Sequence, residues 1–94
     1  MSIDVVEQEV AAPVAATLCR LSAEGVYWRV LVAAWRRDEQ EWVGRLVFEP
    51  EGAAGASEVR EGPPLLRGRS RAEVVASAHE IPERHLRLLL HSLV

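Results

Sequence analysis

The sequence predicts a small α+β fold, in which an antiparallel β-meander of three to four strands carries two C-terminal helices packed on one face. Two observations lead to this prediction. Residues 26–48 hold all three tryptophans, the only tyrosine and the only phenylalanine of the 94-residue chain, in a pattern typical of paired strands. Residues 70–93 then show the capping and spacing signals of two helices. The length suits a single domain, residues 1–94, with one core.

The N-terminal part of the chain leaves alternatives open. Residues 1–13 can form an arm or a short edge strand, and Pro13 ends this segment. Residues 14–21 can form a short helix after Pro13, or a strand. We favour the strand, joined to the next one by the turn Ser22–Gly25, because a meander gives an apolar central strand a neighbour on each edge. Cys19 would then lie in the middle of this strand.

A central β-hairpin is predicted from residues 26–35 and 41–49, which flank the polar residues 36–40. The second segment alternates apolar and polar side chains with the period of a half-buried strand. Opposite charges favour pairing Arg36 with Glu41. In this register the predicted core face consists of Tyr27, Leu31, Ala33, Trp35, Trp42, Gly44, Leu46 and Phe48.

The first strand of the hairpin is also apolar on its second face, which consists of Trp28, Val30, Val32 and Ala34. A strand that is apolar on both faces is usually covered on both sides, and this chain is short. Either the N-terminal segment or another subunit must cover the second face. We therefore predict these residues to be an interface, and the protein to be a non-catalytic protein-interaction module that forms a homodimer or binds another protein.

The segment after the hairpin is predicted to be mostly irregular. Residues 50–57 read as a loop, because Gly52 and Gly55 interrupt a run of small residues. Residues 57–61 read as a short fourth strand that ends before Pro63.

Two helices are expected at the C-terminus. Ser70 and Glu73 have the spacing of a capping box, and this helix should run to about Glu80. Pro82 then suits the start of the next helix. The first helix carries on one side Ala72, Val75, Ala76 and His79. The second carries an amphipathic stripe that we expect to pack on the predicted core face: Leu86, Leu89, Leu90 and Leu93.

Composition limits the partners and the location. Eleven arginines and no lysine or asparagine are typical of a GC-rich bacterial genome. The formal net charge of −3 gives no overall attraction to nucleic acid or anionic membranes. A single cysteine cannot form an intramolecular disulfide, and no apolar run approaches the roughly 20 residues that cross a bilayer. We therefore expect a cytoplasmic protein that does not bind membranes.

Arginines are concentrated just before and at the start of the first helix, and this arginine cluster consists of Arg60, Arg67, Arg69 and Arg71. Arginines beside a helix N-terminus can bind phosphate groups, so nucleic-acid or anion binding is an alternative function. The competing interpretation is a solvated loop in which these arginines pair with Glu58, Glu61 and Glu73. We favour the solvated loop.

No catalytic or metal site is predicted. The histidines His79, His85 and His91 are six residues apart, whereas two ligands on one helix face require a spacing of three or four. Cys19 has no base beside it in the sequence and reads as a core thiol. We expect neither enzyme activity nor a cofactor.

The run Gly68–Val74, following a small sheet, resembles HicB-like antitoxin domains, which also place a capped helix after such a sheet. The resemblance is limited to this run, and no residue roles are carried over from it. It implies a second alternative, an antitoxin-like regulatory subunit.

Overall fold

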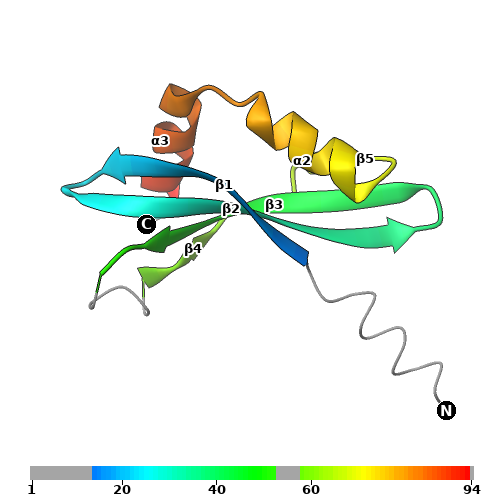
Figure 1. Ribbon diagram of the computed structural model, residues 1–94, viewed down its shortest axis with the longest axis horizontal. Helices are drawn as coiled ribbons and strands as arrows, with labels where there is room; N and C mark the ends of the chain where they lie inside the picture. The colour runs from blue at the N-terminus through cyan, green and yellow to red at the C-terminus, as the bar shows by residue number, and fades with distance from the viewer. Residues whose placement is uncertain (1–13, 53–57, 94) are drawn as a thin grey trace, which may run out of the picture.

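The computed structural model describes residues 14–52 and 58–93 (Figure 1). It contains an antiparallel sheet in the order β1-β2-β3-β4, with β5 also paired to β3, and two helices at the C-terminal end. The elements are β1 (Val14–Ala23), β2 (Val26–Asp38), β3 (Glu41–Pro50), β4 (Arg60–Glu61), β5 (Leu66–Gly68), α2 (Arg71–His79) and α3 (Glu83–Ser92). The predicted α+β fold is confirmed. The predictions for residues 1–13 and for 53–57 within the loop lie outside the described residues.

Residues 14–21 form a strand and not a helix, because β1 pairs along its length with β2. The turn between them is shorter than predicted and consists of Glu24 and Gly25, with φ angles of 57° and 81°. A two-residue turn with both φ angles positive matches the right-handed twist of the two strands that it joins. In the described residues, neither helix is long and apolar enough to cross a membrane.

The predicted register of the β2–β3 hairpin is wrong by one residue. Arg36 pairs with Trp42, and Glu41 pairs with Asp38, because an irregularity between Arg36 and Asp38 adds a residue to β2. Asp38 organises this end of the hairpin: its Oδ1 accepts a hydrogen bond from the Gln40 backbone N–H at 2.8 Å. Its carbonyl oxygen accepts another from Arg36 Nε at 3.1 Å. These local contacts, and not an Arg36–Glu41 charge pair, set the register.

This shift exchanges the two faces of β2. The residues predicted as an interface lie instead in the core, each at most 2% exposed: Trp28, Val30, Val32 and Ala34. They share a face with the β3 residues Gly44, Leu46 and Phe48. The β2 residues predicted to be core lie on the opposite face: Tyr27, Leu31, Ala33 and Trp35. The predicted interface is therefore corrected, since its side chains are enclosed within one chain.

Both helices cover the same side of the sheet, above it in Figure 1. Helix α2 buries Val74 and Ala78, and α3 buries Leu86 and Leu90. The leucine stripe of α3 packs on the core that contains Leu46 and Phe48, as expected, while Leu89 and Leu93 are partly buried at its margin.

The predicted start of α2 is confirmed with one difference. Ser70 is the N-cap, and its Oγ accepts a hydrogen bond from the Glu73 backbone N–H at 3.2 Å. The Glu73 carboxylate accepts from the backbone N–H of Arg69 at 2.7 Å, whereas in a capping box the donor would be the N–H of Ser70. Helix α3 begins immediately after Pro82.

Candidate functional site

The side of the sheet opposite the helices carries an apolar surface, which we call the open face: Leu31, Ala33, Trp35, Val43 and Val47. Cross-strand pairs build it, with Leu31 opposite Val47 and Trp35 opposite Val43. Ala33 and Val43 are only 8% and 4% exposed, and the larger side chains around them are half-buried. No helix of the described residues lies on this side of the sheet (Figure 1). The second apolar face predicted for β2 therefore exists, but on other residues.

Arginine side chains lie within and beside the open face. Arg45 pairs with Ala33 and stands between Val43 and Val47 on β3. The guanidinium of Arg45 lies 5.1 Å from the ring centroid of Trp35, and that of Arg20 lies 3.9 Å from the ring centroid of Tyr27. Arg29 pairs with Glu49 across the hairpin at 3.4 Å. The open face and its surroundings thus carry charges of both signs, and Arg20, Arg29 and Arg45 each form a surface ion pair with a glutamate.

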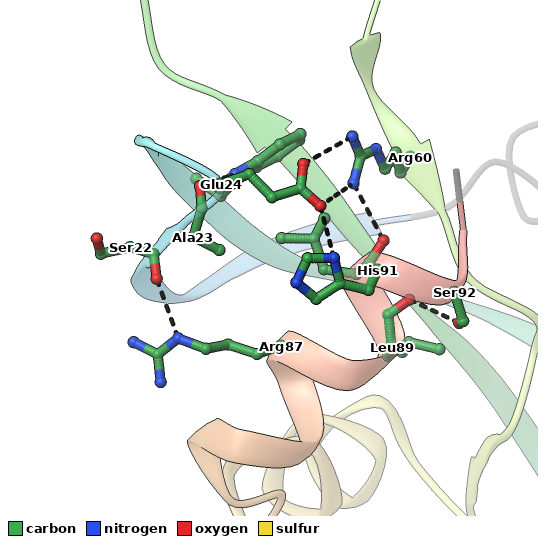
Figure 2. Close-up of polar contacts among 10 residues, drawn as sticks. Ser22, Ala23, Glu24, Arg60, Arg87, Leu89, His91 and Ser92 are labelled. Carbon is green, nitrogen blue, oxygen red and sulfur yellow. Dashed lines mark hydrogen bonds and ion pairs between the residues drawn. The ribbon is translucent and has the colours of Figure 1, made fainter.

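The first member of the arginine cluster, Arg60, has a structural role (Figure 2). Its Nη2 lies 3.0 Å from Glu24 Oε1, and its Nη1 donates a hydrogen bond to the Leu90 carbonyl oxygen at 3.1 Å. Its guanidinium also lies 4.6 Å from the ring centroid of Trp28. Since the side chain is only 16% exposed, these contacts occupy it and tie β4 to the β1–β2 turn and to α3.

Glu24 is the centre of this cluster. His91 Nδ1 lies 2.9 Å from Glu24 Oε2, on the carboxylate that also binds Arg60 (Figure 2). The hydrogen bond from Arg60, aided by the charges of Arg60 and His91, lowers the pKa of Glu24 below its ordinary value. The carboxylate is therefore held in its ionised form.

The other members of the arginine cluster lie apart from Arg60. Strand β4 pairs with β3 at Val47 and Phe48, whereas β5 pairs at residues 42–44, nearer the other end of β3. Arg67 binds Glu41 at 2.8 Å, a partner that the sequence did not suggest. Arg69 and Arg71 flank the N-cap of α2 and are exposed. The four arginines predicted to bind an anion therefore do not form a single cluster: Arg60 lies apart from Arg67, Arg69 and Arg71.

A cavity of about 200 Å³ between β1 and the helices brings together Cys19, His79 and Glu83. Burial, and secondarily the charge of Glu83, raises the pKa of the Cys19 thiol above its ordinary value. This is the opposite of what a nucleophilic cysteine requires. This cavity could not be predicted from the sequence, because Cys19 belongs to a different element and Pro82 separates His79 from Glu83. Across residues 14–52 and 58–93, no group of three His, Cys, Asp or Glu side chains could hold a metal ion.

A larger groove of about 600 Å³ lies between β1 and α2 and is lined by Ala16, Ser70, Arg71, Ala72, Val75, Ala76 and His79. Its α2 wall contains the side of the helix that the sequence showed as apolar. That side does not face the sheet, because Val74 and Ala78 occupy the contact with the core. Small apolar side chains are therefore left beside β1.

Comparison of the chain with models of known protein families, with curated proteins and with solved structures found no match in any of the three. The resemblance to HicB-like antitoxin domains therefore rests on residues 68–74 alone.

Proposed function

We propose that the protein is a non-catalytic protein-interaction module that forms a homodimer through the open face. One observation supports this proposal most directly: the apolar cross-strand pairs Leu31–Val47 and Trp35–Val43 lie on the side of the sheet opposite both helices. Apolar surface on which the described residues place no helix usually marks a contact site. The proposal keeps the predicted self-association and moves it to the opposite face of β2.

The size of the face is compatible with a small dimer. Strands β1 and β3 are each 10 residues long. At about 3.3 Å per residue and about 4.8 Å between strands, the whole side of β1, β2 and β3 that includes the open face measures about 500 Å². Two copies packed face to face would bury about 1,000 Å² in total, near the lower limit for a specific interface.

The charges within and beside the open face support a second copy as the occupant. Arg29 and Glu49 lie side by side, as do Arg45 and Glu61 at 3.5 Å. A two-fold axis through the open face can therefore place basic groups of one copy beside acidic groups of the other. A surface that carried charges of only one sign would instead repel a second copy.

The experiment is the absolute mass in solution, measured by light scattering on a sizing column at about 50 mM and about 500 mM salt. We expect a dimer at both, because apolar contact is not weakened by salt. Leu31→Arg should give a monomer. Leu88→Arg, a matched change at a 66% exposed position on α3, should leave the dimer intact. A wild-type monomer at both salt concentrations would refute the proposal.

The alternative functions have less support. Nucleic-acid or anion binding loses two of its four predicted residues to internal contacts, since Arg60 binds Glu24 and Arg67 binds Glu41. For an antitoxin-like subunit the chain offers only the capped start of α2. We keep the protein-interaction module as the proposal, in a reducing compartment such as the cytoplasm that suits the single Cys19.

A further inference from the structure

Strand β1 ends the sheet on one side. It pairs with β2 along one edge, and no strand of the described residues pairs with its other edge. Every second residue of such an edge directs an N–H and a C=O outward without a partner strand. At the far end, Arg87 Nε donates a hydrogen bond to the Ser22 carbonyl oxygen at 3.0 Å. The stretch that remains for pairing runs from residue 15 to residue 21.

The groove between β1 and α2 meets this strand at Ala16. Its floor includes Ala16, and its wall includes Ala72, Val75 and Ala76. These side chains are too small to fill the space beside them, so side chains from outside can enter. The volume of about 600 Å³ falls in the range of about 300–1,000 Å³ that is typical of binding sites.

The charge of the groove is one-sided. Arg71 lies at one end of the α2 wall and His79 at the other, and the described residues contribute no acidic side chain to the lining. Within the residues that the structure describes, Arg71 forms no ion pair. An acidic side chain is therefore the complement of the Arg71 end.

We propose that the β1 edge and this groove together bind an extended segment of a partner protein, added as a further strand beside β1. The segment would carry β-branched apolar residues at alternate positions, facing the groove, and an acidic residue beside Arg71. Main-chain hydrogen bonds would supply affinity and the groove would supply specificity, as in other cases of strand addition. A second copy fits less well, because its own β1 offers the small residues Ala15, Ala16 and Thr17.

The test uses the full chain and a defined probe. The probe is a capped peptide of about seven residues that alternates valine and threonine between two terminal glutamates, long enough to span the open edge at about 3.3 Å per residue. Binding is followed by titration calorimetry and by hydrogen exchange of the β1 amides. We expect saturable binding that slows exchange of outward-facing amides in residues 15–21.

Two controls define the mode of binding. The same peptide with alternate backbone amides methylated should bind at least tenfold more weakly, since it cannot complete the ladder. Arg71→Glu should weaken binding of the glutamate peptide by about five- to tenfold. The same variant should bind a matched peptide with terminal lysines more tightly than the wild type does. This reversal of charge preference distinguishes specific binding at the groove from nonspecific binding of the peptide to the protein surface.

The proposal is overturned if the peptide does not bind at millimolar concentration, if the methylated peptide binds equally, or if binding leaves exchange of the β1 amides unchanged. The last result would indicate a helix or loop resting on α2 instead of strand addition. The Leu31→Arg variant should bind the peptide as the wild type does. Peptide binding by that variant and the mass of the wild type thus test this inference and the proposed dimer separately.

Discussion

Val74 lies directly over Gly44: its Cγ1 is only 2.5 Å from the position that a Cβ on Gly44 would occupy. Gly44 pairs with Ala34, so α2 sits on the smallest cross-strand pair of the core face. The absence of a side chain at residue 44 sets how closely the helix approaches the sheet. Since α2 also forms a wall of the groove, this contact positions that surface as well.

Gly44→Ala should destabilise the protein by about 1–3 kcal/mol, because the new methyl group overlaps Val74 and must displace α2. The measurement is urea unfolding followed by tryptophan fluorescence. Adding Val74→Ala should recover part of the loss, so that the double variant is more stable than the two single changes predict by addition. Simple additivity would show that the two residues are not in contact.

Two valine truncations distinguish the faces of the hairpin. Val30→Ala removes a fully buried side chain and should cost about 2 kcal/mol, whereas Val47→Ala on the open face should cost less than about 1 kcal/mol in the monomer. Unfolding should be measured at a protein concentration well below that at which copies associate, so that only the stability of the monomer is compared. Equal losses would contradict the difference in burial between Val30 and Val47.

Acid should weaken the contact between Glu24 and Arg60. The pKa of Glu24 is lower in the folded chain than its ordinary value of 4.5, so its contribution is present above that pH and is lost as pH falls through the folded pKa. Unfolding free energies measured from about pH 6 to about pH 3 should therefore fall less steeply for Glu24→Gln than for the wild type.

The matched control for this experiment is Glu58→Gln. Glu58 is exposed and forms no ion pair among the described residues, so its removal should leave the pH profile parallel to that of the wild type. Identical profiles for all three proteins would mean that the carboxylate of Glu24 is not held by Arg60.

Cys19 should react slowly with alkylating reagents. Its pKa lies above the ordinary value of 9.0, so the thiolate fraction at neutral pH is smaller than that of a free thiol. The rate of reaction with iodoacetamide, followed against pH, should reach half of its maximum above pH 9. Glu83→Gln should move this midpoint down, and Glu80→Gln should not, because Glu83 is the charge that acts on the thiol. A midpoint below that of a free thiol would contradict the assignment.

The sequence predicted the elements well and the register poorly. Alternation and β-branching identified the hairpin, and Ser70 and Glu73 identified the start of α2, because these signals are local. The exchange of faces came from one added residue between Arg36 and Asp38, which depends on side-chain contacts at a turn. With β2 apolar on both sides, hydrophobicity alone could not reveal the error.

The candidate surfaces were predictable only in part. The unusual apolarity of β2 correctly indicated a second apolar face, although the residues named for it, such as Trp28, were those of the core. The sequence identified an apolar side of α2 with Ala72 and Val75 but no groove, because it could not show that Val74 would face the sheet instead. The pairing of Arg60 with Glu24, 36 residues away, left no local signal at all.

The Arg60 cluster has a consequence for folding kinetics. Its contacts join residues 30 and 36 positions apart along the chain, so they can form only after the β1–β2 turn and α3 have both been placed. Interactions that are absent from the transition state slow unfolding and have little effect on the folding rate. Loss of the Arg60 side chain should therefore shorten the lifetime of the native state while the chain still folds at its original speed.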